Sequence, residues 1–319
     1  MQNNIAVIGA GISGMAVASL LLQKGYKVTI YAKDFSPNIT SNRAAAFWFP
    51  YHIRNDSRGI GWCRYTYDYF KTYSANPQTG ISMKTLHKVV EQHVAEEQAG
   101  WVSFMPEGSY HMVAPHLLPK GVAQIYEATV PLIETQLFLP WLQQQLTNAG
   151  VQFIQQNISS LDSLLQQHSF VINCAALGAV QLCNDSSLIP VRGQVALLQP
   201  ANLPLIYLNN EKSLYIVPRK DAIIVGGTYE ENVNDPVTEP AALQQILNKA
   251  YTAMPQLTQQ TVLGSWAGLR PYRSDVRVEK EPGKNIIHNY GHGGSGFTLS
   301  FGCALTVTEI LQQYLPAKA

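Results

Sequence analysis

The chain has 319 residues, of which 46% are hydrophobic and 13% are charged, and its formal net charge is +1. This length can bury a large core, and the composition is that of an ordinary globular protein with one large domain or two interleaved ones. The near-neutral charge argues against a nucleic-acid partner, which would require a basic stripe on the surface.

The N-terminal residues and the cysteines indicate in which cellular compartment the protein is expected. The apolar N-terminal run lacks the basic residues that open a secretory signal, and three glycines interrupt it. A transmembrane helix needs about twenty uninterrupted apolar residues, which this run does not have. We therefore expect a cytoplasmic protein with no membrane partner. The cysteines show neither a C-x-x-C pair nor metal-ligand spacing, so we expect reduced thiols and no metal at Cys63, Cys174, Cys183 and Cys303.

Residues 5–32 predict a strand–helix–strand unit. The runs "IAVIG" and "KVTIYA" are typical of buried parallel strands. Between them, Gly9 permits a tight turn, Gly11 lets the backbone approach a pyrophosphate, and Gly14 lets the helix pack against the strand. The N–H groups at the helix N-terminus favour phosphate. We therefore predict a dinucleotide site with contacts from Gly9, Ala10, Gly11, Ile12, Ser13 and Gly14.

The end of the second predicted strand leaves the ribose contact open. An Asp or Glu is expected at this place. The sequence reads A-K-D, so either Asp34 or Lys33 makes the contact. Farther along, the hydroxyls of Thr40 and Ser41 either bind phosphate or belong to a solvated loop.

The following segments alternate between helical and strand patterns. Three alanines, residues 44–46, would let a planar ring lie against the backbone, or else they start a helix that stops before Pro50. The spacing predicts helices over 60–74, 129–150 (with a lead-in segment) and 239–255. It predicts parallel strands over 151–154 and 170–179, and antiparallel strands over 190–200, 213–232 and 262–268.

This order predicts an α/β fold with two parts. One is a discontinuous, Rossmann-like cofactor domain, and the other is a substrate domain built on an antiparallel sheet. The seam between them is the expected substrate site. We assign 1–50, 141–195 and 262–319 to the cofactor domain, and 51–140 and 196–261 to the substrate domain.

The stretch "IIHNYGHGGSGFTLSFGCAL", residues 286–305, is dense in glycine and then helical. Its glycines would let backbone groups crowd a flat ligand at a second helix N-terminus. Together with "GLRPYRSDVRVE" it resembles the D-amino-acid oxidase family of FAD enzymes, within the superfamily that includes glycine oxidase, and "HNYGHGGSGFT" is close to that family's signature. The resemblance covers nearly the whole chain through "VIGAGISGMAVA", "AAAFWFPY", "VINCAALGA", "PVRGQV" and "YIVPRKDAIIVGGTYEEN".

The resemblance implies a non-covalent FAD and a set of residue roles. Arg270 of G-L-R-P would grip the substrate carboxylate, the Tyr215 hydroxyl would assist it, and the Gly294 carbonyl would accept from the substrate amine. Further implied cofactor contacts are Ala45, Ala46, Ile158, Arg192, Gly293, Gly296, Phe297 and Thr298. The implied substrate-pocket residues are Phe49, Tyr51 and Ser295.

The sequence departs from vertebrate members of this family at two places. Glu211 stands where a second active-site tyrosine is found, and Ser295 stands where a bulkier tyrosine is found. His52 and Arg54 are expected near the pocket mouth. These differences affect which substrate side chain the pocket is expected to accept.

The implied reaction is oxidative deamination of a D-amino acid. Hydride would pass from Cα to the flavin, and oxygen would reoxidise the flavin and give hydrogen peroxide. The imino acid would hydrolyse to a 2-oxo acid and ammonia. Such a reaction depends on orientation more than on a general base, and a guanidinium fixes the direction of a carboxylate as lysine cannot.

Several alternatives stay open. The chain could be a glycine, sarcosine or other secondary-amine oxidase, a D-amino-acid dehydrogenase that reduces a quinone, or a flavin-binding protein without turnover. The expected partners are an amino acid and oxygen, with a homodimer as one candidate assembly. An acidic substrate would need a second cation, but an ion pair is the favoured role of the three candidates Arg54, Arg219 and Arg273.

The remaining charged residues of interest are expected to be structural. Arg277, in the alternating "VRVEK", is predicted to pair with a neighbouring acid on a strand face. Arg273 stays undecided between the pocket rim and an ion pair. His288 and His292 are predicted to have structural roles, because the proposed chemistry needs no acid or base on carbon.

Overall fold

The computed structural model describes residues 4–92 and 100–316. The predicted N-terminal unit is confirmed, with β1 (Asn4–Ile8), α1 (Ile12–Gln23) and β2 (Lys27–Ala32) in that order. β1 pairs in parallel with β2 and with β7 (Phe170–Asn173), and β2 pairs in parallel with β6 (Gln152–Gln155). β14 (Ile286–His292) adds to β7, also in parallel. β1, β2, β7 and β14 are mostly buried in the way that a doubly wound sheet requires, whereas the edge strand β6 is half-buried.

The predicted antiparallel strands are also confirmed, and they continue the same sheet. The strand order is β4-β5-β3-β9-β10-β11-β8-β13-β14-β7-β1-β2-β6, and β12 pairs with β8 off this path. The added strands are β3 (Ile81–Val90), β4 (Tyr110–Met112), β5 (Gln124–Ile133), β8 (Ile189–Leu198), β9 (Leu205–Asn209), β10 (Leu214–Pro218), β11 (Ile223–Gly226), β12 (Glu230–Glu231) and β13 (Val262–Lys280).

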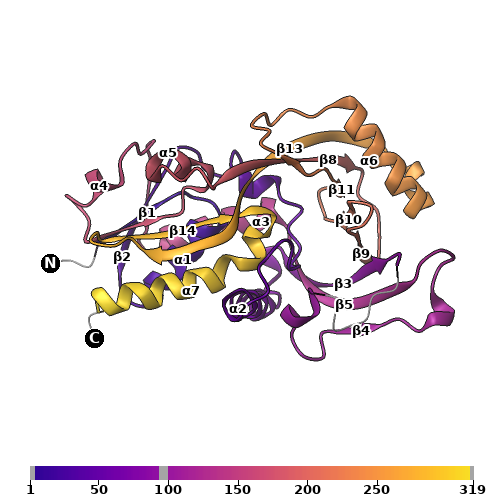
Figure 1. Cartoon of the computed structure of the whole chain (residues 1–319), viewed down its shortest axis with the longest axis horizontal. Helices are drawn as coiled ribbons and strands as arrows, with labels where there is room; N and C mark the ends of the chain where they lie inside the picture. Colours follow the sequence, from indigo (N-terminus) through magenta and orange to yellow (C-terminus); the bar gives the residue numbers. More distant parts are fainter. Residues whose placement is uncertain (1–3, 93–99, 317–319) are drawn as a thin grey trace.

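The long strand β13 joins the two parts of the sheet. Its first half pairs with β8, and its second half pairs with β14, with an irregular register between Tyr272 and Arg277. Figure 1 shows β13 running from the region under α6 to the strands beside α1 and α7. The exact bounds of the two predicted domains stay a prediction, because the strands pass from one part to the other without a break.

Helices cover the two parts of the sheet separately. α1, α2 (Ser57–Tyr73) and α7 (Gly296–Tyr314) pack together beside the parallel strands, and α3 (Thr135–Asn148) contacts α1. Gly302 permits the close approach of α7 to α2, because a Cβ there would overlap the backbone of Trp62. α6 (Pro240–Ala253) packs against β8, β10 and β11. The short helices α4 (Leu161–Leu164) and α5 (Ala179–Cys183) follow β6 and β7.

Local details differ from the sequence prediction at three places. The strand predicted over 170–179 ends at Asn173, because a 3-10 turn at Ala176–Gly178 and then α5 follow it. The lead-in to the helix predicted over 129–150 is itself the end of β5, and α3 begins only at Thr135. Residues 44–46 start no helix: Ala46 has φ +56°, so the chain turns there instead.

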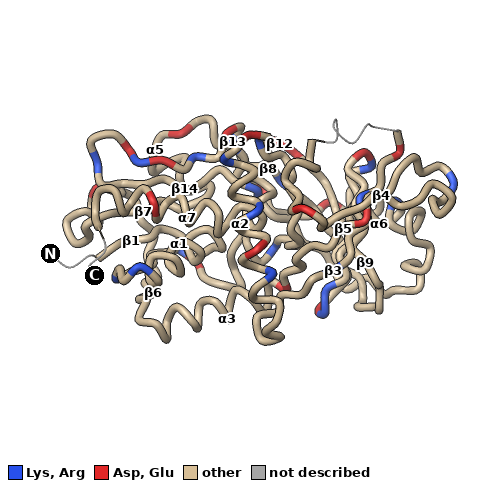
Figure 2. Tube along the Cα trace, turned by 90° about the horizontal axis from the view of Figure 1, so that it is seen from below, with Lys and Arg blue, Asp and Glu red and all other residues tan. Residues whose placement is uncertain are grey.

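Within the described residues, one helix, Gly293–Tyr314, is long and apolar enough to cross a membrane. However, 67% of its most apolar stretch is buried inside the protein, where α7 contacts α1 and α2. The core helix of a globular protein has the same profile. Figure 2 shows Lys and Arg interspersed with Asp and Glu along the whole trace.

Candidate active site

A cavity of about 240 Å³ lies where the two parts of the sheet meet. The N-termini of α1 and α7 contribute to it from the cofactor side, and β8, β10 and β13 contribute from the other side. Segment 40–47 runs along the wall between them. Many of the site residues that the sequence predicts are therefore brought together from distant parts of the chain at one seam.

The glycine turn after β1 has the geometry that the G-x-G-x-x-G pattern predicts. Gly9 has φ +103°, and a Cβ there would overlap the carbonyl oxygen of Cys174. A Cβ on Gly14 would overlap the carbonyl oxygen of Gly9. Gly11 lines the cavity, and its Cβ would lie 3.0 Å from the Ser41 hydroxyl. The turn therefore has no room for side chains at Gly9 and Gly14, and a side chain at Gly11 would press on the Ser41 hydroxyl.

The N-terminus of α1 fits a phosphate group. Its first turn carries no acidic residue, so the helix dipole and its N–H groups favour an anion there. Ser41 Oγ accepts a hydrogen bond of 3.1 Å from the Ile12 N–H, and Thr40 lies on the cavity wall beside it. Of the two readings of these hydroxyls, the position at the helix N-terminus favours a phosphate contact over a solvated loop.

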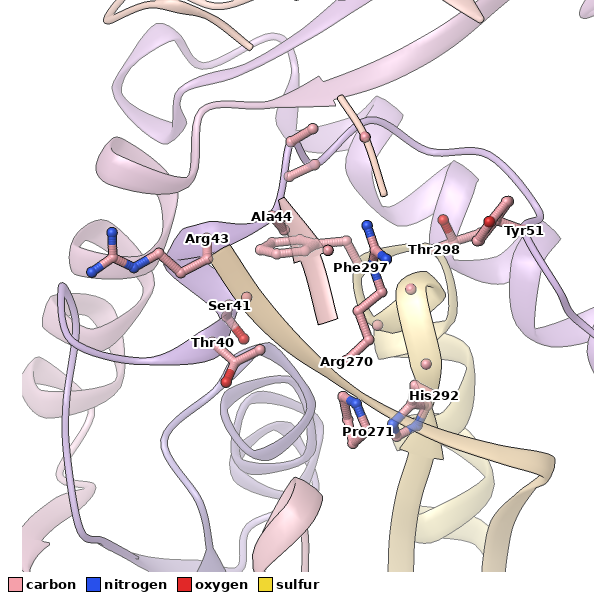
Figure 3. A pocket seen from close by; sticks show the side chains of 18 of the residues that line it. Thr40, Ser41, Arg43, Ala44, Tyr51, Arg270, Pro271, His292, Phe297 and Thr298 are labelled. Atoms are coloured by element: carbon pink, nitrogen blue, oxygen red, sulfur yellow. The ribbon is translucent and has the colours of Figure 1, made fainter. Parts of the chain in front are cut away.

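Arg270 projects from β13 into the cavity (Figure 3). Its Nη1 donates to the carbonyl oxygen of Thr228 at 2.9 Å, which fixes the direction of the side chain. The side chain lies over Gly193 on the neighbouring strand β8, where a Cβ would overlap the guanidinium. Gly193 therefore provides the space in which Arg270 lies, a role that sequence analysis had not assigned to it.

Tyr215 lies beside Arg270 on the cavity wall. Gly226 faces it across the β10–β11 pair, and a Cβ on Gly226 would overlap the phenol ring. Burial raises the pKa of Tyr215, while the positive charge of Arg270 acts in the opposite direction. The phenol is therefore protonated at neutral pH and available as a hydrogen-bond donor next to the guanidinium.

Gly294 and Tyr51 complete this cluster. A Cβ on Gly294 would lie 3.1 Å from Tyr51 Cδ1 and 3.5 Å from Arg270 Cδ, so the backbone of Gly294 lies directly beside both side chains. Burial raises the pKa of the Tyr51 phenol. Three separate segments, β13, residues 49–51 and the start of α7, thus place a cation, a phenol and a peptide group at one point.

The hydroxyl groups of two predicted site residues are engaged in hydrogen bonds with backbone groups instead of pointing freely into the cavity. Thr298 Oγ1 accepts from the Phe49 N–H at 3.2 Å and donates to the Phe49 carbonyl at 3.0 Å. Ser295 Oγ accepts from the Tyr51 N–H at 3.2 Å and donates to its carbonyl at 2.6 Å. Thr298 lines the cavity, whereas Ser295 is buried behind it. The segment of Phe49 and Tyr51, which both line the cavity, is held against α7 at two points.

The predicted contacts divide into those that line the cavity and those that do not. The lining contains Gly11, Ile12, Ser13, Thr40, Ser41, Ala45, Ala46, Gly293, Gly294, Gly296, Phe297 and Thr298. Gly9, Ala10 and Gly14 shape the turn from behind. Lys33 and Asp34 are both exposed after β2 and outside the lining, so their ribose contact stays a prediction. Ile158 packs beside a small apolar cluster, and Arg192 is buried in ion pairs with Glu230 and Glu239.

Sequence analysis missed several lining residues. Tyr229 lines the cavity, and its ring stacks on His52 with centroids 5.0 Å apart. The His52 ring also contacts Tyr51, with a centroid distance of 4.2 Å. Glu211 lies on the turn between β9 and β10, outside the cavity, and its carboxylate accepts a hydrogen bond from the Glu91 N–H. The phenols near Arg270 that could take the place of the second active-site tyrosine are those of Tyr229 and Tyr51. The remaining missed residues include Arg43, Leu208, Asn210, Ser213 and Leu214.

The other arginines are held by acids, as predicted. Arg54 is 68% exposed and lies 3.0 Å from Asp275. Arg277 lies 2.7 Å from Glu279 and also donates to the Tyr290 hydroxyl. The undecided Arg273 forms an ion pair of 3.1 Å with Asp185. Arg219 is buried against Asp221 and Glu134 and lies outside the cavity lining, in which Arg43 and Arg270 are the arginines. Arg54 and Arg273 line an adjoining cavity that shares Arg270 and Tyr51 with this one.

The two histidines of the glycine-rich block are buried. Burial lowers the pKa of His292 to about 4, and its Nε2 lies 3.1 Å from Asn289 Oδ1. Burial and the nearby Arg277 lower the pKa of His288. Both rings are therefore neutral at pH 7. The four cysteines are free, and no group of three metal-ligating side chains occurs in the part of the chain that the structure describes.

Comparison with known proteins identifies the relatives of this chain. A family model described as FAD dependent oxidoreductase matches residues 4–310. D-amino-acid oxidase from Rubrobacter xylanophilus is 33% identical over 93% of this chain and 92% of its own length. D-amino acid oxidase from Dugesia ryukyuensis is 35% identical over 98% of both chains. The fold is that of glycine oxidase from Geobacillus kaustophilus, with a TM-score of 0.83 at 17% identity, covering 98% of this chain and 95% of that one.

Proposed function

The chain belongs to the FAD dependent oxidoreductase family, and from that premise we propose that it oxidatively deaminates a D-amino acid. The products would be an imino acid, which hydrolyses to a 2-oxo acid and ammonia, and hydrogen peroxide from oxygen. The observation that carries the proposal is the place of Arg270 in the cavity lining, next to the phenols of Tyr51 and Tyr215 and the backbone of Gly294. Relatives named D-amino-acid oxidase that are 33–35% identical support it.

The cavity residues fit the FAD that the family uses. The three glycines after β1 leave a cradle that side chains would fill, and the N-terminus of α1 presents N–H groups to a pyrophosphate. The small residues 44–46 offer a flat wall to a ring system. Bound FAD supplies a two-electron acceptor for the hydride on the substrate Cα. The protein then has to place that Cα and exclude other orientations.

Arg270 is proposed to bind the substrate carboxylate. Its Nη1 already donates to Thr228, which leaves other N–H groups of the guanidinium to pair with a carboxylate. The protonated Tyr215 donates a further hydrogen bond from the side. Because the pair is planar and charge-assisted, it fixes the direction of the Cα–carboxylate bond as well as its position.

The Gly294 carbonyl is proposed to accept from the substrate amine. The carboxylate and the amine would then be held by groups on β13 and at the start of α7, which are in contact with each other. With two of its four substituents fixed, the Cα presents its hydrogen in one direction only, and this orientation supplies most of the lowering of the barrier. No side chain is required to remove a proton from carbon.

The proposal is tested by the products. The purified holoenzyme is mixed in air with a panel of D-amino acids, their L-enantiomers, glycine and sarcosine, and hydrogen peroxide and 2-oxo acid are measured. We expect both products from D-amino acids in equal amounts. Peroxide from glycine and sarcosine alone would identify a secondary-amine oxidase. Flavin reduction without peroxide would identify a dehydrogenase. Either outcome would contradict the proposal.

A further inference from the structure

We propose that Arg219, Thr135 and Trp266 form a brace that positions the cofactor wall, segment 42–46, from behind. None of the three lines the cavity, whereas residues 43–46 do. The brace is therefore separated from bound FAD by the wall that it holds. The inference rests on the proposed function only in placing FAD in this cavity, and it makes no use of an amino acid.

The first element of the brace is a completely buried guanidinium. The Arg219 side chain is 0% exposed, and its Nη1 donates both to the Ala44 carbonyl at 3.2 Å and to Thr135 Oγ1 at 2.9 Å. Its Nε donates to Asp221 at 2.9 Å, and Glu134 lies 3.7 Å away. Two carboxylates thus neutralise a charge whose remaining hydrogen bonds are directed to the wall segment.

The second element extends the contact to the neighbouring carbonyls. Thr135 Oγ1 accepts from Arg219 and donates to the Asn42 carbonyl at 3.3 Å. Trp266 Nε1 donates to the Arg43 carbonyl at 2.9 Å. Three consecutive carbonyl oxygens, those of residues 42, 43 and 44, are therefore each bonded by a different side chain on the side away from the cavity.

The brace elements also contact one another. The Arg219 guanidinium lies 6.0 Å from the centroid of the Trp266 ring, and the Arg43 guanidinium lies 5.7 Å from it, so both cations are within reach of the indole. Figure 3 shows Arg43 pointing away from Arg270, out of the substrate end of the cavity. Farther along, the Ile133 N–H donates to the Ala46 carbonyl at 2.8 Å.

A guanidinium is required for this arrangement. One planar group donates to Asp221 on one edge and to Ala44 and Thr135 on another, which a lysine ammonium cannot do from a single nitrogen. The wall has no side chains larger than methyl at residues 44–46 that could fix its position by packing. Its position therefore depends on hydrogen bonds to its backbone. Arg219 and Trp266 are positioning residues and make no contact with substrate.

The test measures the release of FAD from the holoenzyme on dilution, followed by the fluorescence of free FAD, together with the visible flavin spectrum. The variants are Arg219→Lys, Trp266→Phe and the double variant. The matched control is Arg64→Lys, because Arg64 donates to the carbonyls of Ser103 and Met105 on a loop outside the cavity. Trp266→Phe keeps an aromatic side chain but removes the indole N–H together with the pyrrole ring, and it remains informative if Arg219→Lys folds poorly.

We expect each single variant to raise the FAD dissociation constant on the order of 10-fold, as expected for loss of a hydrogen bond that holds the wall segment, and to shift the flavin bands. In the double variant, the FAD dissociation constant should rise by less than the product of the two single-variant factors, because both residues hold the same segment. Arg64→Lys should bind FAD like the parent. The proposal is overturned if Trp266→Phe and Arg219→Lys keep parental FAD affinity and spectrum, or if their effects simply multiply.

Discussion

Arg270 has one role in this account, which is to bind the substrate carboxylate. In Arg270→Met the guanidinium is lost while the FAD cradle after β1 is unchanged. Truncating one partner of a buried charge pair costs about 2–5 kcal/mol, so we expect kcat/KM for the best D-amino acid to fall by roughly 30- to 4000-fold. The variant should remain yellow. Steady-state kinetics with a check of FAD content measures this, and normal kinetics would refute the assignment.

The space for Arg270 is provided by Gly193. In Gly193→Ala the new methyl would overlap the guanidinium, which must move. Forcing a methyl into a packed site costs about 1–3 kcal/mol, which corresponds to roughly a 5- to 150-fold loss of kcat/KM if the cost falls on Arg270. The control is Gly61→Ala on α2, where a Cβ meets nothing within 4 Å. An unchanged KM in Gly193→Ala would show that Arg270 does not bind at this place.

His292 makes stability depend on pH. Its pKa is about 4 in the folded protein because of burial, against 6.5 in the unfolded chain. The unfolded state binds more protons between these values, so the free energy of unfolding should decrease as the pH falls from 6.5 toward 4. Urea unfolding at pH 7 and pH 5 should show this loss. In His292→Asn the decrease should be smaller, and an equal slope in both proteins would remove His292 from the explanation.

At the scale of elements, α7 connects the site to the core. The 3-10 turn that leads into it carries Gly294 and Ser295, its own first turn carries Thr298, and farther along it Gly302 allows contact with α2. The position of the site therefore depends on how closely the two helices pack. The hydroxyl contacts of Ser295 and Thr298 with residues 49–51 transmit that position to the cavity wall.

This gives a prediction for Gly302→Ala. A Cβ at this position would overlap the backbone of Trp62, which cannot move aside like a flexible side chain. We expect a loss of about 1–3 kcal/mol in the free energy of unfolding. Gly61→Ala on the exposed face of α2 should instead gain about 0.5–1 kcal/mol, since alanine is the better helix former. Chemical denaturation of both variants measures the difference, and equal stabilities would refute it.

The elements near the N-terminus could be predicted from sequence because each relies on local signals. The alternation of apolar runs and the three glycines defined β1, α1 and β2 within a residue or two. Residues 44–46 could not be predicted in this way, since alanine favours helix locally. Their turn is imposed by Arg219, Trp266 and β5, which are distant in sequence. The roles of Ser295 and Arg192 were missed for the same reason, because their partners lie on other elements.

At the scale of the whole molecule, one continuous sheet contributes both to the proposed cofactor site and to the proposed substrate site. The parallel strands place two helix N-termini at the cofactor end, and the antiparallel strands place Arg270 and Tyr215 at the substrate end. β13 pairs with β8 at one end and with β14 at the other, so the distance between the two ends is fixed by strand pairing. An orientation-dependent reaction requires such a rigid relation.

The most direct test of this account is anaerobic flavin reduction. The oxidised holoenzyme is mixed without oxygen with each enantiomer of a neutral amino acid, and the visible flavin absorbance is followed. With the carboxylate and the amine held by Arg270 and Gly294, only one enantiomer can direct its Cα hydrogen toward the flavin. We predict that the D-enantiomer bleaches the flavin rapidly and that the L-enantiomer does not, in line with the relatives named D-amino-acid oxidase. Bleaching by both enantiomers at similar rates, or by neither, would contradict the account.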